Sequence, residues 1–190
     1  ISCEDDVIDL KPVNQLSDIT AFATPERCEL SVIGAYDAIQ CGSYNDSYSR
    51  GYPFGAASII QGEMRGQDMN LTAVIYDITY SSTYSTSTAN NRFYWETSFE
   101  AINRINTVLK GIEGAVENST ITEEQGNAYK GELLFLRALT YHSLLIHFAY
   151  PVNVDLNKNY GLPLYLNANN SPSEIEESMK IGRSTVQETY

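Results

Sequence analysis

The chain has 190 residues and is 43% hydrophobic, which is enough to bury one core, so we expect a single folded domain. Asp and Glu outnumber Lys and Arg by 24 to 12, which gives a formal net charge of -12. Because no basic cluster is present to neutralise phosphates, this composition argues against nucleic acid as a partner.

The N-terminal segment begins Ile1, Ser2, Cys3 and continues with acidic residues. A small residue before a cysteine at the extreme N-terminus is typical of the end of a lipobox, where the chain is cut and the cysteine becomes lipidated. We therefore predict lipidation at Cys3 and an extended tether over residues 1–23. The alternative is a terminal cysteine with no such role.

The first predicted helix covers residues 25–40, because Thr24 can act as N-cap and Pro25 suits the first helical position. Its apolar face is expected to contain Cys28, Val32, Ala35, Tyr36 and Ile39. Gly42 is expected to end it in the left-handed conformation. A loop with three tyrosines and a shorter helix over residues 55–65 should follow.

The other two cysteines, Cys28 and Cys41, fall at the two ends of this helix. They would lie about 20 Å apart along its axis, too far for a disulfide. The chain has no CxxC and no histidine at zinc-ligand spacing from a cysteine, so we expect no metal site and no cofactor.

Residues 71–90 are compatible with either strand or helix, because Val74, Tyr76, Ile78 and Tyr80 alternate as in a strand. Tyr76, Tyr80 and Tyr84 are spaced by four and share one side in both conformations. The chain has 14 tyrosines, many among Ser, Thr, Asn and Gly, a mixture typical of wet binding surfaces. Composition alone favours the alternative of amphipathic rings at the edge of the core. For the row itself, rings that face the core are at least as common as rings that face a ligand.

Two long helices are predicted next, the first over residues 90–113 with Gly114 ending it. Its apolar stripe consists of Trp95, Phe99, Ile102, Ile105, Leu109 and Ile112. Thr122 and Gln125 match a capping box for the second helix, which should extend to Phe148. Residues 133–148 are apolar on every face, so we expect this helix to be central, while its Arg and His residues argue against a membrane span. The pair forms an antiparallel hairpin, the unit of helical-repeat proteins.

Beyond residue 150 the chain is expected to be extended, with a turn at residues 161–164. Ser184 and Gln187 match a second capping box, which would open a helix at the last residues. Because a domain rarely ends one turn into a helix, we expect the chain to be a piece of a longer protein.

Several segments together resemble the SusD/RagB family. The strongest similarity is to its GE-x-x-FLRA-x-x-Y segment, at residues 131–141. Other similar segments stand in the family's order: Leu10-Lys11-Pro12 after Cys3, Tyr36-Asp37, W-x-x-x-F-x-x-I-x-x-x-N at residues 95–106, Gly161-Leu162-Pro163-Leu164 and residues 183–190.

The resemblance implies a mainly α fold of tetratricopeptide-like helical hairpins with long loops. Residues 24–190 would be the helical N-terminal domain, truncated at its C-terminal end. It also implies a cell-surface lipoprotein in the outer leaflet of the outer membrane, where the acidic residues after Cys3 resemble an export signal of Bacteroidetes lipoproteins. Such a protein binds oligosaccharide or polysaccharide and acts with a SusC-like TonB-dependent transporter in polysaccharide utilisation and nutrient import.

Sugar recognition needs exposed aromatic faces beside side chains that hydrogen-bond hydroxyl groups. The region that corresponds to the family's variable ligand loops supplies six candidate ligand-binding residues: Arg65, Asp68, Asn70, Tyr80, Tyr84 and Asn90. Trp95 is expected in the core. Arg137 is expected to be a buried tie that needs a carboxylate or several carbonyls as partners.

An enzyme is not expected, because no carboxylate pair stands out as acid and nucleophile and no nucleophile elbow, phosphate loop or HExxH occurs. His142 and His147 are five residues apart, a spacing that separates them around a helix. Two other functions stay open: a helical adaptor that docks to the transporter without binding sugar, and capture of peptides rather than glycans.

Overall fold

The computed structural model describes residues 18–41, 51–70, 77–83, 85, 88–151 and 160–190. Its helices are α2 (Asp18–Ala21), α3 (Pro25–Cys41), α4 (Ala56–Glu63), α5 (Asp77–Tyr80), α6 (Ala89–Glu117), α7 (Glu123–Phe148), α8 (Pro172–Ser178) and α9 (Val186–Thr189). No strand occurs in these ranges, so the prediction of a mainly α fold is confirmed. None of the helices described is long and apolar enough to cross a membrane.

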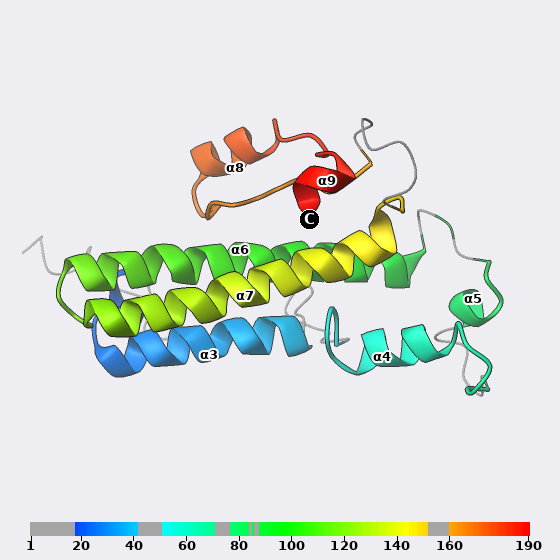
Figure 1. The fold of residues 1–190 in the computed structure, drawn as a ribbon, viewed down its shortest axis with the longest axis horizontal. Coiled ribbons are helices and arrows are strands. Elements are labelled where there is room, and N and C mark those ends of the chain that lie inside the picture. The colour runs from blue at the N-terminus through cyan, green and yellow to red at the C-terminus, as the bar shows by residue number, and fades with distance from the viewer. Residues whose placement is uncertain (1–17, 42–50, 71–76, 84, 86–87, 152–159) are drawn as a thin grey trace, which may run out of the picture.

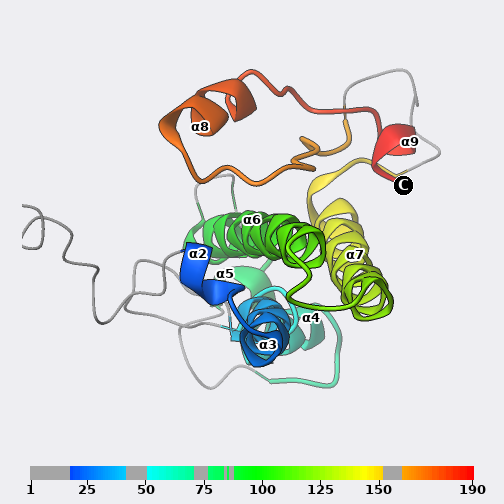
Figure 2. The ribbon, with the colours of Figure 1, turned by 90° about the vertical axis from the view of Figure 1, so that its left-hand side faces the viewer.

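Three long helices, α3, α6 and α7, lie side by side, and α6 and α7 form the expected antiparallel hairpin (Figures 1 and 2). The capping box at the start of α7 is confirmed: Thr122 Oγ1 accepts from the backbone N–H of Gln125 at 3.2 Å. Gly114 does not end α6, which continues to Glu117. An interior glycine costs only about 1 kcal/mol, and the burial of Ala115 and Ile121 at this end offsets that cost.

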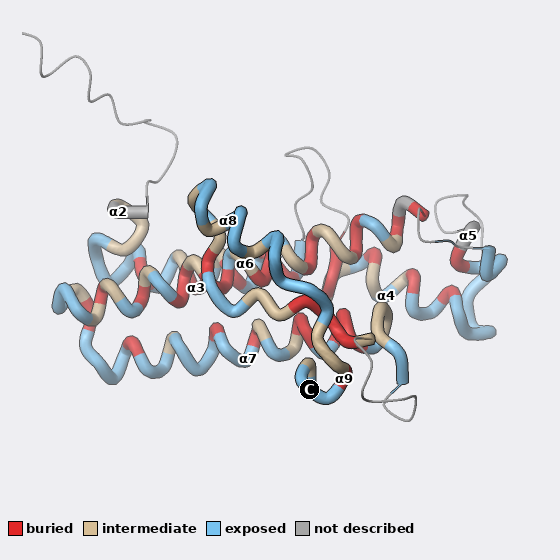
Figure 3. Tube along the Cα trace, turned by 90° about the horizontal axis from the view of Figure 1, so that it is seen from above, coloured by how far each residue is buried: buried red, intermediate tan, exposed pale blue. Residues whose placement is uncertain are grey.

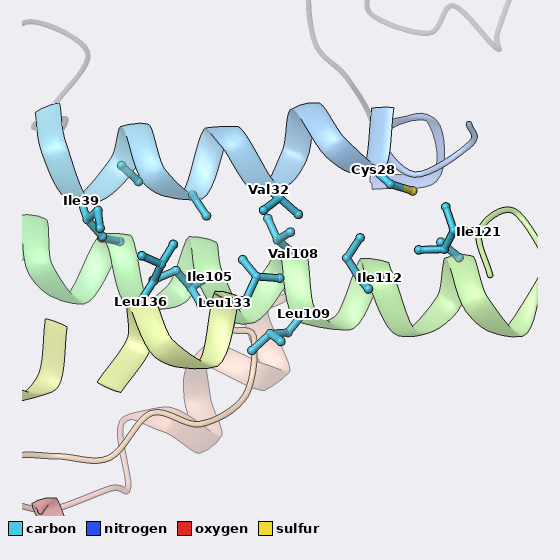
Figure 4. Close-up of a cluster of buried hydrophobic side chains, with 14 residues drawn as sticks. Cys28, Val32, Ile39, Ile105, Val108, Leu109, Ile112, Ile121, Leu133 and Leu136 are labelled. Atoms are coloured by element: carbon cyan, nitrogen blue, oxygen red, sulfur yellow. The ribbon is translucent and has the colours of Figure 1, made fainter. Parts of the chain in front are cut away.

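The main core is formed by α3, α6 and α7 (Figure 4). Buried side chains from these helices interdigitate there, and they include Cys28, Val32, Ile39, Ile105, Val108, Leu109, Ile112, Leu133 and Leu136. Cys28 is a buried thiol near one end of α3, and Cys41 is exposed at the other. Tyr36 was expected in this core but is 42% exposed and donates a hydrogen bond to Glu132 on α7, while Ala38 is buried instead. A small side chain fits between closely packed helices where a phenol ring does not.

The expectation that α7 is central is wrong. Phe135 and Ile146 are 62% and 64% exposed on its outer face. The helix covered on more sides is α6, which packs against α3 and α7 and also lies beneath the C-terminal segment (Figures 2 and 3). Asn106 on α6 donates to the carbonyl oxygens of Tyr165 and Asn167, at 2.9 and 3.1 Å.

The C-terminal segment is held on the helical hairpin by Leu162 and Val186, which are buried against residues of α6 and α7. Arg137 is a tie, as expected, but it is half-buried rather than buried and has one amide oxygen and one carbonyl oxygen as partners. Its Nη1 donates to Asn106 Oδ1 at 2.7 Å and to the carbonyl oxygen of Leu166 at 3.0 Å. Gly161 is required by close packing, because a Cβ there would lie 2.3 Å from the carbonyl oxygen of Thr185.

The last helix begins one residue later than predicted. Its capping box is formed by Thr185 and Glu188 rather than by Ser184 and Gln187. The hydroxyl of Ser184 donates instead to the carbonyl oxygen of Leu162, at 2.7 Å. A further capping box, Ser171 with Glu174, opens α8 and was not predicted.

The range assigned to the tether, residues 1–23, contains one described segment. Residues 18–21 form the single turn α2, which contacts α3, and Phe22 packs against the main core. The helical domain therefore begins before residue 24. Cys3, Gly42 and Tyr76 lie outside the described residues, so the predictions made for them stay predictions.

Candidate functional site

The candidate site lies at one end of the molecule, where α4, α5, the beginning of α6 and the end of α7 come together (Figure 1). Two neighbouring hollows share Arg65 in their walls. The outer cleft, of about 590 Å³, lies between the residues that follow α4 and Tyr80. The arginine groove, of about 760 Å³, is lined by Arg65, Asn91, Arg92, Trp95, His147 and Arg183, among others.

A buried polar network behind the outer cleft joins α4, α5 and α6. Gln61 is only 4% exposed and accepts from the hydroxyl of Tyr52 at 2.6 Å. Its amide nitrogen donates to Thr79 Oγ1 and Asn91 Oδ1, both at 3.3 Å. Because a buried amide is costly unless its hydrogen bonds are made, this network fixes the three helices relative to one another. Tyr52, one of the three tyrosines of the predicted loop, is fully buried here.

The floor of the arginine groove is aromatic. The ring of Tyr94 stacks on Tyr52 with centroids 4.8 Å apart, and it lies 4.7 Å from the His147 ring. Burial lowers the pKa of His147 despite its hydrogen bond with the carbonyl oxygen of Ser143, and the nearby charge of Arg65 lowers it further. His147 is therefore neutral at pH 7. The charge of the groove comes from arginine.

Trp95 was predicted to lie in the core, but it is only partly there. It packs on the second cluster of buried side chains, with Phe99 and Phe148 at centroid distances of 4.7 and 5.2 Å, but it is only half-buried and lines the arginine groove. Arg183 Cζ lies 5.2 Å from the centroid of its ring, within the range of a cation–π contact.

The guanidinium of Arg183 is fixed by the backbone as well as by the indole. Its Nη1 donates to the carbonyl oxygens of Phe148 and Gly161, at 3.1 and 2.8 Å. These bonds join the end of α7 to the C-terminal segment. Arg183 is consequently held at the edge of the groove before any ligand arrives.

Three of the chain's seven arginines line this one groove. Arg92 Nε lies 3.7 Å from Glu96 Oε2, an ion pair too long to be a hydrogen bond. Within the described part of the chain, Arg65 and Arg183 make no ion pair with a carboxylate, and no Asp or Glu lines the groove. No group of His, Cys, Asp and Glu in that part could hold a metal ion.

The six candidate ligand-binding residues are only partly brought together. Arg65 and Tyr80, which is 45% exposed, line the outer cleft. Asp68 and Asn70 are exposed on the segment after α4. Asn90 is 5% exposed and lines neither hollow, whereas its neighbour Asn91 lines the groove. Tyr84 lies outside the described residues.

Arg92 and Arg183 line the groove but were not among the predicted ligand-binding residues, and Trp95, predicted for the core, lines it too. Arg92 and Trp95 are three apart on α6, so a helical projection brings them to one face and could have suggested them together. Arg183 reaches the groove only because the C-terminal segment folds back over the end of α7.

Comparison with known proteins gives two matches. A SusD-like family described as starch-binding and associating with the outer membrane matches residues 34–190. The crystal structure of a SusD superfamily protein from Bacteroides fragilis is similar to this chain, with a TM-score of 0.68 and 29% sequence identity. The match covers 89% of this chain and 37% of that protein, so the chain spans little more than a third of its relative. No curated protein sequence matches.

Proposed function

The chain belongs to the SusD-like family of starch-binding proteins that associate with the outer membrane, and on this basis we propose that it captures oligosaccharides at the two hollows that share Arg65. Members of the family are binding proteins and not enzymes, in line with the prediction made from the sequence.

One observation carries the proposal: two aromatic side chains with exposed surface, Tyr80 and Trp95, line adjacent hollows with a guanidinium group between them. The apolar face of a sugar ring can stack on such rings, and its hydroxyl groups can accept from guanidinium or amide N–H groups. Volumes of about 590 and 760 Å³ lie in the range of small-molecule sites.

The test is calorimetric titration of the protein with maltoheptaose, a starch oligosaccharide, and with a panel of plant and host oligosaccharides. We expect at least one oligosaccharide to bind and Tyr80→Ala to weaken that binding about tenfold, because stacking of one ring on an aromatic side chain contributes roughly 1–3 kcal/mol. Tyr36→Ala is the matched control, since Tyr36 is exposed to a similar extent on α3, away from both hollows. Equal effects of the two substitutions would refute the site.

Membrane attachment and partnership with a transporter belong to the same proposal. Lipidation of Cys3 would anchor the protein in the outer leaflet, with the residues that follow it as a tether and the helical domain outside the membrane. A SusC-like TonB-dependent transporter would receive the oligosaccharide. Replacing Cys3 with serine should release the protein from outer membranes, and copurification of a transporter with the wild-type protein would support the pairing.

A second function, docking without sugar binding, is favoured by apolar side chains exposed on neighbouring helices. Leu30 and Ile33 on α3, and Phe135 on α7, face solvent outside both hollows. Exposed apolar groups on adjacent helices are typical of interaction surfaces. If Phe135→Ser abolished copurification with the transporter while every glycan in the panel failed to bind, adaptor would become the better description.

A further inference from the structure

We propose that the arginine groove selects acidic oligosaccharides, whose rings carry carboxylate or sulfate groups; this inference rests on the proposed function and specifies its ligand. The groove collects positive charge in a protein whose net charge is -12. This local positive charge is opposite in sign to the net charge of the protein, so the groove attracts anions that the rest of the surface repels.

Only one of the three arginines in the groove has a carboxylate partner among the residues described. Arg92 is offset by Glu96, and His147 is neutral at pH 7 because burial lowers its pKa. Arg65 and Arg183 are left without a carboxylate partner among the residues described. A ligand that supplies one or two negative groups would complete the pairing.

Arg183 has donors to spare. A guanidinium carries five N–H groups, and the two bonds to backbone carbonyls use Nη1 alone. Nε and Nη2 make no hydrogen bond to any described residue, and together they form the edge that binds a carboxylate or sulfate through two parallel bonds. The contact with Trp95 holds this planar group in place, so little side-chain entropy is lost when an anion binds.

The other walls of the groove favour a sugar over a simple anion. A volume of about 760 Å³ is far larger than one ion needs and suits two or three sugar rings. The half-buried indole of Trp95 offers an apolar surface beside the guanidinium groups, and Asn91 offers an amide. An acidic sugar presents both an apolar ring face and an anionic group, which matches this arrangement.

The experiment compares trigalacturonate with its methyl ester, which has the same three rings without the charge. Binding of each to the wild-type protein is measured by calorimetry at low and at high salt. Arg65→Gln and Arg183→Gln each remove one groove charge, and Arg104→Gln is the matched control because Arg104 is exposed on α6 and lines neither hollow. Thermal melting of each variant shows whether it is folded. If Arg183→Gln unfolds because its hydrogen bonds to the backbone are lost, Arg65→Gln alone tests the proposal.

We expect trigalacturonate to bind about tenfold more tightly than the ester at low salt, with the difference shrinking as salt rises. Each groove substitution should reduce that preference about threefold or more, and Arg104→Gln should leave it unchanged. Equal binding of acid and ester would overturn the selectivity while leaving the proposed function intact. Failure of both probes and of the neutral panel would overturn the proposed function too. Oligoglutamate that bound as tightly, with the same dependence on Arg65, would show that the ligand is an acidic peptide.

Discussion

Replacing Tyr141 with phenylalanine should loosen the C-terminal segment from α7. Tyr141 is buried, and its hydroxyl accepts from the backbone N–H of Tyr165 at 2.7 Å while donating to the carbonyl oxygen of the same residue at 3.2 Å. That carbonyl also accepts from Asn106, so it keeps one partner after the substitution. The N–H of Tyr165 loses its bond. A fully buried donor left unpaired costs about 1–3 kcal/mol, and because this bond is only part-buried we expect a cost of about 1–2 kcal/mol.

The magnitude can be measured by denaturant and thermal unfolding. For a domain of this size, 1 kcal/mol corresponds to a shift in Tm of about 2–4 °C, so we expect Tyr141→Phe to lower the Tm by about 2–8 °C. Tyr165→Phe is the control, because the hydroxyl of Tyr165 makes no hydrogen bond to a described residue. If the unfolding free energies of the two variants differ by less than about 0.5 kcal/mol, the hydrogen bonds of Tyr141 do not stabilise the fold as argued.

The same residue predicts a dependence on alkaline pH. Burial raises the pKa of Tyr141 to about 12, partly opposed by its hydrogen bond with Tyr165 and by the charge of Arg137. Since an unfolded tyrosine titrates near pH 10, the stabilisation is complete below about pH 10 and is lost as the pH rises towards 12. The stability gap between the wild-type protein and Tyr141→Phe should therefore narrow over that interval, and a constant gap would contradict the assignment.

Three further outcomes are expected. Leu133→Ala should cost about 2–5 kcal/mol in unfolding free energy, because it leaves a cavity in the main core; a cost below 1 kcal/mol would mean that α7 packs differently. Gln61→Leu should speed hydrogen exchange in α4 and α5 by breaking the network with Tyr52; unchanged exchange would exclude that role. Hydrogen bonds from the backbone N–H of Asn170, from Ser171 and from Lys110 lower the pKa of Glu174 to about 2. The capping of α8 should therefore hold above about pH 4.5 and weaken only as the pH falls towards 2. An NMR titration of the Glu174 carboxyl would check this.

Helix ends could be predicted where a cap depends on neighbours in the sequence. The Thr122 and Gln125 capping box involves residues three apart and forms as expected. The Ser171 and Glu174 box has the same spacing and was readable in the same way. The last helix differs, because Ser184 and Thr185 each have a suitable residue three positions on, and the sequence offers no basis for choosing. A contact with Leu162, from another part of the chain, engages Ser184 and leaves the capping role to Thr185.

The candidate site was harder to predict than the helices. Arg65 and Tyr80 were predicted because they lie in a polar, tyrosine-rich stretch of the chain, and both line the outer cleft. Asn90 and Asn91 look equivalent in sequence, but adjacent positions on a helix point about 100° apart, so one is buried and the other lines the groove. Trp95 fits the apolar stripe of α6, yet it lies where that helix meets the edge of the core.

The amino-acid sequence by itself determined the long helices α3, α6 and α7, the shorter α4, the hairpin of α6 and α7 and the membership of a SusD-like family, because periodicity, caps and motifs are local properties. Only the tertiary structure decided which face of α7 meets solvent, since an apolar helix can bury any side and its neighbours make the choice. It likewise decided that Arg65, Arg92 and Arg183 share one groove. These residues come from three parts of the chain, and only packing of the helix ends brings their charges together.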